Sequence, residues 1–234
     1  SKVGKPNQII TRGGSIQQDG SLENIRIPTG HPEGYLEAFA QNNYTKELDD
    51  VGRVLDLITA KSSFKNEIDL SKVHLIGHSR GGGIVLIRAE EDPRVHSVVT
   101  WAGVCDYKVR FQEGSSAFEN FKKQGRFHVE NARTKQQMPH NWQFYTNFIK
   151  HQERLTIKRA AKDLKKPLLI IHGDQDTTVQ LNEAKQLHSW CSGSELFIIK
   201  KANHVFNASH PYKEIELPKS LASVVSKTTS FLIP

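Results

Sequence analysis

The stretch Val73–Gly83 reads VHLIGHSRGGG, and it decides the fold. Its apolar run, Val73–Ile76, is broken only by His74 and reaches Gly77. A glycine-rich turn then leads into a second apolar run, Ile84–Ile87. Because a tight turn separates the two runs, the pattern predicts a strand, a sharp turn and a helix.

The same alternation continues along the rest of the chain. It predicts strands at 95–101, 167–172 and 195–200, and helices at 45–60, 182–190 and 218–232. The first of these helices follows from apolar residues at three- and four-residue steps, namely Leu48, Val51, Leu55 and Ile58. Strands that alternate with helices predict an α/β fold, with a mainly parallel sheet flanked by helices.

Between 106 and 160 the pattern changes, because aromatic and basic residues mix there without a strand signal. The aromatic residues include Phe111, Phe118, Phe121, Phe127, Trp142, Phe144, Tyr145 and Phe148. We interpret 106–160 as a helical cap inserted into a single domain that spans 1–234. The insertion is a helical layer with its own core or a lid that faces the substrate, and the two interpretations are compatible.

Composition is that of an ordinary globular protein, with 37% apolar and 24% charged residues. No run approaches the roughly 20 apolar residues of a membrane-spanning helix, and the first residues, SKVGKPNQ, lack the apolar stretch of a secretory signal. We therefore expect a cytoplasmic protein without a membrane partner. The net charge of +7 comes from Lys and Arg that interleave with Asp and Glu, which favours a solvated surface over nucleic-acid binding.

The two cysteines, Cys105 and Cys191, form no C-x-x-C spacing. We expect two reduced thiols rather than a disulfide or a metal site. No ligand spacing for a metal occurs, and no cofactor is expected.

The turn GHSRG, residues 77–81, fits the pattern G-x-S-x-G between a strand and a helix, where that pattern carries a nucleophile. Ser79 is therefore the predicted nucleophile. Such a sharp turn crowds its neighbours, so we expect that Gly77 and Gly81 must both lack side chains. The N–H of Arg80, at the start of the helix, is the predicted oxyanion donor.

A serine hydroxyl needs a base, and the base needs an acid to orient it. The strand at 167–172 breaks at Gly173 into an acidic turn, where Asp174 and Asp176 compete for the role of the acid. Either aspartate could instead cap the turn or the next helix. His204 follows the last predicted strand closely, and this position separates it from the other histidines as the predicted base.

The motifs GHSRGG, HGDQDTTV and ANHVF, in the order Ser, Asp, His, resemble those of the α/β-hydrolase superfamily. The resemblance covers roughly residue 36 to the C-terminus. It is nearest to the dienelactone-hydrolase-like and serine-aminopeptidase-like esterases, through EAFAQNNYTKELDD ahead of the nucleophile. It implies that the acid is Asp176 rather than Asp174 and that His204 is the base.

Members of this superfamily usually carry earlier strands and a His-Gly turn that supplies a second oxyanion N–H. The only His-Gly pair here is His172-Gly173, on the later acid-bearing strand, so we expect the N-terminal part of the fold to be incomplete. By composition the stretch 1–35 is mostly irregular, with one candidate strand at 8–11. Loss of one oxyanion donor typically lowers turnover by about 10²–10³.

The predicted function is hydrolysis of a carboxylic ester through an acyl-enzyme on Ser79, with a small-molecule ester as the substrate. Peptide or amide hydrolysis by the same three residues is one alternative, and a non-catalytic binding protein that keeps the fold is another. A homo-oligomer is possible, because an uncovered sheet edge invites pairing with another chain.

Overall fold

The computed structural model describes residues 32–60, 68–131, 135–209 and 211–233. The candidate strand at 8–11 lies outside these residues. The central sheet has four parallel strands in the order β1-β2-β5-β6, which are Val73–His78, Val95–Trp101, Leu168–Gly173 and Ser194–Ile199. The predicted α/β fold with a mainly parallel sheet is confirmed, and each predicted strand begins within one residue of its expected position.

The register of the strands brings their carboxyl ends to one edge of the sheet. His78 at the end of β1 pairs with Trp101 at the end of β2, and Gly173 at the end of β5 pairs with Ile199 at the end of β6. Every residue of β5 is buried. The residues that follow these ends therefore converge, and Ser79 is one of them.

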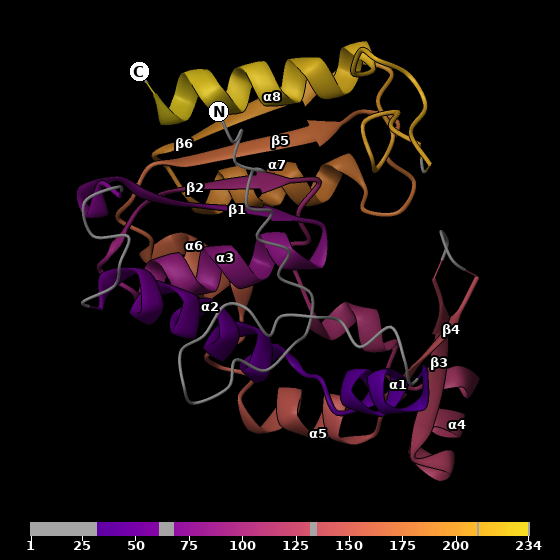
Figure 1. Cartoon of the computed structure of the whole chain (residues 1–234). Coiled ribbons are helices and arrows are strands. Elements are labelled where there is room, and N and C mark those ends of the chain that lie inside the picture. Colours follow the sequence, from indigo (N-terminus) through magenta and orange to yellow (C-terminus); the bar gives the residue numbers. More distant parts are fainter. Residues whose placement is uncertain (1–31, 61–67, 132–134, 210, 234) are drawn as a thin grey trace, which may run out of the picture.

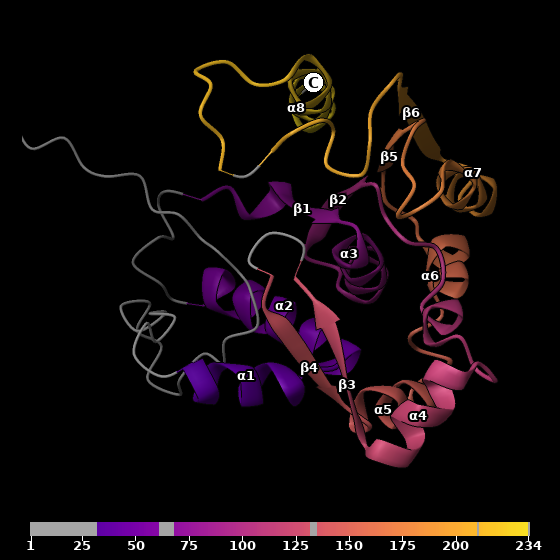
Figure 2. The same ribbon diagram turned by 90° about the vertical axis from the view of Figure 1, so that its right-hand side faces the viewer.

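Helices cover the two faces of the sheet (Figure 1, Figure 2). One face carries α3, α6 and α7, which are Arg80–Glu91, Ile157–Asp163 and Leu181–Trp190. The other face carries α8, Lys219–Leu232, over β5 and β6. Because side chains of a strand alternate between its faces, Ile170 packs into the core under α3 and α7, whereas Ile171 packs toward α8.

Helix α2, Tyr44–Thr59, packs against α3 through the apolar stripe that the sequence predicts. Leu48 and Leu55 are buried on this stripe. The side chain of Asn43 caps the first turn by accepting a hydrogen bond of 3.0 Å from the Lys46 N–H. The helices predicted at 45–60, 182–190 and 218–232 are all confirmed to within one residue.

Helix α1, Pro32–Ala40, corrects the expectation that the chain is mostly irregular as far as residue 35. The helix is short, and its sequence PEGYLEAFA shows no clear apolar period. Its first residue is a proline, which is common at that position of a helix. The proline was the local signal that could have predicted this helix.

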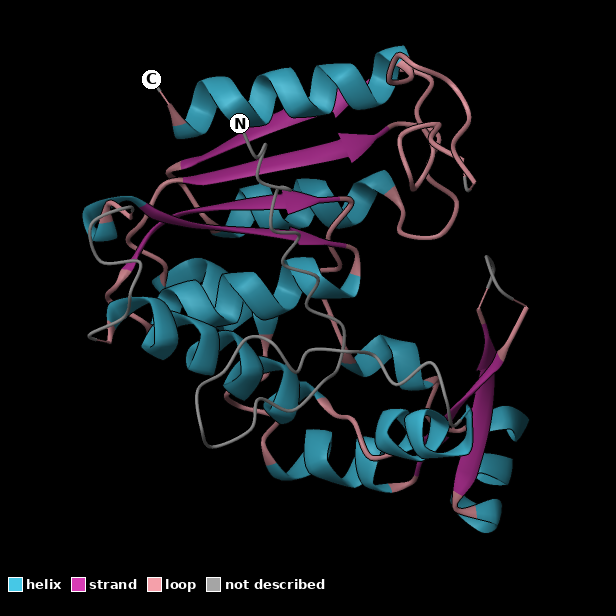
Figure 3. Cartoon of the chain, viewed as in Figure 1, coloured by secondary structure: helices cyan, strands magenta, loops and turns pink. Residues whose placement is uncertain are grey.

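The elements between β2 and α6 lie mostly apart from the sheet, beyond α2 and α3 (Figure 3). They are α4 Ser116–Gln124, β3 Arg126–Glu130, β4 Gln137–Asn141 and α5 Gln143–Lys150. The stretch expected as a purely helical cap thus also contains an antiparallel hairpin, which the sequence analysis missed. Strand β3 is largely exposed and β4 contains Pro139, so neither shows the alternation of a half-buried strand. The domain boundaries at 106 and 160 stay a prediction.

Strand β1 is an outer strand of the sheet, as far as the described residues go. Val73 and Leu75 face the core under α3, so the side chains of His74, Ile76 and His78 point the other way. Among these, Ile76 is 46% exposed. The expected incompleteness of the N-terminal part of the fold stays a prediction.

The glycines around Ser79 differ in what their neighbours allow. A Cβ on Gly77 would lie 2.2 Å from the carbonyl oxygen of Gly81 and 2.6 Å from Cγ2 of Val85, so no side chain fits there. A Cβ on Gly81 would meet no described atom within 4 Å outside its own helix and its chain neighbours. The expectation that both glycines must lack side chains is therefore right for Gly77 and wrong for Gly81. At Gly81 it is the backbone carbonyl group, and not the side-chain position, that lies close to Gly77.

We predict that Gly77→Ala lowers the free energy of unfolding by about 3 kcal/mol, because the clash involves backbone that cannot rotate away. Gly81→Ala is the matched control, and it should keep this free energy or raise it by up to about 1 kcal/mol, since alanine is the better helix former. Chemical unfolding followed by circular dichroism measures both variants. Equal stability of Gly77→Ala and the wild type would contradict the close approach.

Candidate active site

Ser79 lies on a strained turn between β1 and α3. Its φ of 56° and ψ of −122° are costly for a residue that has a Cβ. Its N–H donates to the Trp101 carbonyl at 2.9 Å, and its carbonyl accepts from the N–H groups of Gly82 and Val104. These hydrogen bonds hold the strained backbone in place, beyond the carboxyl end of β1.

Three residues from the ends of three strands form one chain of hydrogen bonds. His204 Nε2 lies 3.0 Å from Ser79 Oγ, and His204 Nδ1 lies 2.7 Å from Asp176 Oδ2. The Asp176 side chain is fully buried, and that of His204 is 18% exposed. The structure thus brings together the predicted nucleophile, base and acid, although Ser79 and His204 are 125 residues apart in the chain.

The carboxylate of Asp176 is oriented by the backbone that follows it. Its Oδ1 accepts the N–H groups of Thr178 at 2.8 Å and Val179 at 2.9 Å, which leaves Oδ2 for His204. Burial acts to raise the pKa of Asp176, but the hydrogen bonds that the carboxylate accepts outweigh it, so the pKa lies below its usual value. Asp176 is therefore ionised at neutral pH and favours the tautomer of His204 that carries a proton on Nδ1.

Asp174, the competing aspartate, has a different partner. Its Oδ1 accepts the backbone N–H of Lys201 at 2.6 Å, and its Oδ2 lies 3.4 Å from Lys200 Nζ. Lys201 has a φ of 56°, a conformation that needs such support. Asp174 thus fixes the start of the loop that carries His204, whereas Asp176 contacts the imidazole itself. The geometry favours Asp176 as the acid.

The loop around His204 is braced by a pair of asparagines. Asn203 Oδ1 accepts the N–H of Asn207, and Asn207 Oδ1 accepts the N–H of Asn203. Asn207 Nδ2 also donates to the Lys201 carbonyl and to Ser220 Oγ on α8. These hydrogen bonds tie the backbone on both sides of His204 to the rest of the loop and to α8.

His172 is a residue of the site that the sequence analysis placed only within a strand. It is fully buried, its Nε2 donates to the Val179 carbonyl at 2.8 Å, and the same atom lies 3.4 Å from Asp176 Oδ2. Burial, the largest influence, lowers the pKa of His172, so the ring is neutral at neutral pH. His172 therefore packs behind the carboxylate of Asp176 as a neutral donor. Its place four residues before Asp176 was the signal that could have identified it.

Arg80 links the nucleophile turn to the cap. As the first residue of α3, it has an N–H without an acceptor in the helix, as the predicted oxyanion donor requires. Its Nη2 lies 2.7 Å from Glu47 Oε1, and its Cζ lies 6.0 Å from the ring centroid of Phe144. Phe144 belongs to α5. The Arg80 side chain therefore connects the turn at Ser79 to an aromatic residue of the segment between β2 and α6.

The aromatic core of the cap contains a histidine. His140 is 5% exposed, its ring stacks on Phe127 with centroids 5.0 Å apart, and it lies 4.7 Å from the ring of Phe144. Its Nδ1 is buried without a hydrogen-bond partner among the described residues. Burial, with a smaller contribution from Arg80, lowers the pKa of His140 to about 4. His140 therefore packs as a neutral aromatic ring.

Two further kinds of reactive group would be a cysteine thiolate and a cluster of metal ligands. Burial raises the pKa of the Cys105 thiol to about 12, so this cysteine is not a thiolate at neutral pH. Within 32–60, 68–131, 135–209 and 211–233, no three His, Cys, Asp or Glu side chains cluster as metal ligands would. In the same ranges, no helix is long and apolar enough to cross a bilayer.

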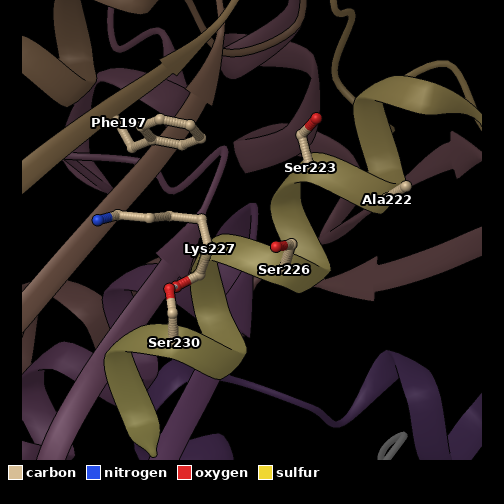
Figure 4. Close-up of a pocket in the computed structure, with 6 residues that line it drawn as sticks. All are labelled: Phe197, Ala222, Ser223, Ser226, Lys227 and Ser230. Carbon is tan, nitrogen blue, oxygen red and sulfur yellow. Dashed lines mark hydrogen bonds between the residues drawn. The ribbon is translucent and has the colours of Figure 1, made fainter. Parts of the chain in front are cut away.

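An open pocket of about 480 Å³ lies between β6 and α8 (Figure 4). It is lined by Phe197, Ala222, Ser223, Ser226, Lys227 and Ser230. Lys227 pairs with Glu195 and lies 5.6 Å from the ring centroid of Phe197, so its charge already has a partner. Neither Ser79 nor its two partners line this pocket, which is therefore separate from the site.

The sequence profile of the prolyl oligopeptidase family matches residues 22–222 of this chain. No curated protein sequence aligns with the chain at a significant level.

Three solved structures illustrate the similarity of fold. The esterase domain of a Rhodothermus marinus protein is 22% identical, with a TM-score of 0.50, over 72% of this chain and 62% of that one. Est1E from Butyrivibrio proteoclasticus is 17% identical, with a TM-score of 0.60, over 82% and 70%. A monoacylglycerol lipase from Paleococcus ferrophilus is 14% identical, with a TM-score of 0.53, over 82% and 75%.

These likenesses concern the fold. At identities of 14–22% they confirm the α/β-hydrolase fold that the three motifs imply. The chain spans less than two thirds of the Rhodothermus domain with which it aligns.

We predict that His140 makes the protein sensitive to mild acid. A histidine in the unfolded chain binds its proton near pH 6.5, whereas His140 in the fold does so only near pH 4. Between these values the unfolded state binds a proton that the folded state does not. The free energy of unfolding should therefore fall by about 3 kcal/mol as the pH is lowered from about 6.5 to about 4. His140→Phe should remove this contribution, as measured by urea unfolding at several pH values.

His128 provides the control, since it is an exposed histidine on β3 of the same hairpin. His128→Gln should still lose stability in mild acid, because it leaves the buried ring of His140 in place. If His140→Phe lost as much stability as the wild type over the same pH range, the loss would not come from His140. The prediction that His140 is buried as a neutral ring would then be contradicted.

Proposed function

Because the chain belongs to the prolyl oligopeptidase family, we propose that it is a serine hydrolase that cleaves a carboxylic ester through an acyl-enzyme on Ser79. In this proposal His204 is the base, Asp176 is the acid, and the N–H of Arg80 is an oxyanion donor. Membership of the family and the α/β-hydrolase fold support a hydrolase in general. The ester substrate and the roles of these residues are the proposed part.

The proposal rests on the hydrogen-bond chain from Ser79 Oγ through His204 to Asp176. A serine hydroxyl is a weak nucleophile at neutral pH, and a base within about 2.6–3.2 Å is what activates it. A histidine with a packing role alone would need no buried carboxylate on its Nδ1, held in turn by two backbone N–H groups. The arrangement therefore supports proton transfer from Ser79 to His204.

The proposed reaction begins when Ser79 Oγ attacks the carbonyl carbon of the ester and His204 Nε2 takes its proton. Asp176 stabilises the imidazolium that forms. The negative charge that develops on the carbonyl oxygen is stabilised by the N–H of Arg80, at the positive end of the α3 dipole. His204 then gives its proton to the leaving alkoxide. A water molecule, activated by the same base, finally releases the acid from Ser79.

An ester is the preferred substrate for two reasons. The Rhodothermus protein is named an esterase and the Paleococcus protein a lipase, and both names denote ester cleavage. The Arg80 side chain, next to Ser79 in the chain, also packs near the ring of the buried Phe144, and apolar surroundings of this kind suit an apolar acyl or alcohol group. Peptide hydrolysis is the second candidate, because the matched family is named for a peptidase. The cytoplasmic location, the partners and the oligomeric state stay predictions.

We predict that a fluorophosphonate probe labels the folded protein on Ser79, because the probe reacts with a serine activated by a base. Ser79→Ala should remove the labelling, and His204→Gln should reduce it strongly. Mass spectrometry of the labelled peptides identifies the residue. A folded protein without an adduct on Ser79 would refute the enzyme proposal and favour a non-catalytic binding protein.

A comparison of substrates separates the two hydrolase candidates. We predict faster turnover of p-nitrophenyl esters than of aminoacyl anilides by the wild-type protein that has not been treated with the probe. Initial rates at several substrate concentrations give kcat/KM for each class. Faster turnover of the anilides would replace the ester by an amide as the substrate.

The two neighbouring aspartates allow a matched test of the acid. We predict that Asp176→Asn lowers kcat by about 10⁴, because an amide no longer favours the required tautomer of His204. Asp174→Asn keeps an acceptor for the Lys201 N–H, so kcat should fall less than about tenfold. Equal losses in the two variants would contradict the assignment of Asp176 as the acid.

A further inference from the structure

His78 immediately precedes Ser79 and contacts the backbone of the proposed base. Its Nε2 lies 2.8 Å from the carbonyl oxygen of His204, and the two ring centroids are 4.7 Å apart. A carbonyl oxygen only accepts, so Nε2 of His78 carries a proton and donates it to this hydrogen bond. Desolvation beside the loop, the largest influence, lowers the pKa of His78, so the ring is neutral at neutral pH and keeps its proton on Nε2.

This hydrogen bond differs from the others that support the loop of His204. The bonds of Asp174 and Asn207 tie the loop to the end of β5 and to α8. The bond from His78 ties it to β1, the strand that ends beside Ser79. It therefore spans the two halves of the site, and it acts on the backbone of the residue whose imidazole must reach Ser79 Oγ.

We infer that His78 is a positioning residue, whose Nε2–H holds the backbone of His204 at the distance from which its imidazole can take the proton of Ser79. This inference rests on the proposed function, since the distance matters to turnover only if His204 is the base. Proton transfer needs the two atoms within about 2.6–3.2 Å, so a displacement of about 1 Å is enough to slow it. His78 itself contacts the backbone of His204 and touches no reacting atom.

Ring packing is the simpler explanation of the same contact, because the His78 ring lies against those of His204 and Phe206. Two variants separate packing from hydrogen bonding. His78→Phe keeps an aromatic ring and lacks a donor. His78→Gln keeps an N–H donor at a similar reach and lacks the ring.

The test measures kcat and KM of the full chain with a p-nitrophenyl ester. We expect His78→Phe to lower kcat about tenfold with KM changed less than about twofold, and His78→Gln to stay within about threefold of the wild type. His74→Phe is the matched control, since His74 lies on the same face of β1 but pairs with Ser97 Oγ, and its kcat should not change. An unchanged kcat in His78→Phe, or equal losses in the Phe and Gln variants, would overturn the inference.

A second measurement does not depend on turnover. The proton on His204 Nδ1, bonded to Asp176, should give a far-downfield NMR signal in the wild type and in His78→Gln. In His78→Phe, or in His78→Leu if the Phe variant fails to fold, the signal should broaden because the loosened loop admits water. An unchanged signal would also overturn the inference. A wild type that hydrolyses no ester would refute the proposed function, while this signal still decides the role of His78.

Discussion

The close approach of Gly77 to the carbonyl of Gly81 is the constraint on which the rest of the site depends. It lets the chain leave β1 and enter α3 within one residue, which forces the backbone of Ser79 into its positive φ. The residues on either side of Ser79 then point in different directions. His78 reaches the loop of His204, and the Arg80 side chain reaches Glu47 and the cap.

The site consists of two halves that are built separately. The nucleophile half is one continuous segment, in which Ser79 is held by backbone bonds to Trp101 and Val104. The other half joins the turn after β5 to the loop after β6, where one aspartate binds the backbone and the other binds the imidazole. The halves meet where β2 pairs with β5, so the geometry at Ser79 Oγ depends on how the sheet places the ends of its strands.

Much of this arrangement could be predicted from local patterns in the sequence. The apolar runs at 73–76 and 167–172 specify two strands of the sheet, and the order of three motifs points to Ser79, Asp176 and His204. The contributions of Asp174 and His78 could not be predicted, because they are contacts between segments that are 27 and 126 residues apart in the chain. The hairpin at 126–141 was missed because its strands pair mostly outside the core and carry no apolar alternation. Whether a side chain fits at Gly81 depends on the packing around it, which no pattern encodes.

In the turn GDQD two aspartates at fixed positions make two different hydrogen bonds. This limits how relatives of the protein can diverge in sequence. Asp174 accepts a hydrogen bond from the backbone of the neighbouring loop, and Asp176 accepts one from the imidazole of His204 on that loop. Gln175, between the two aspartates, is exposed. Evolution is free to change the identity of the middle residue. Its deletion, however, would remove the N–H that donates to the Ala202 carbonyl and would change the spacing of the two carboxylates. Selection should therefore conserve the length of this turn more strictly than the identity of the residue at position 175.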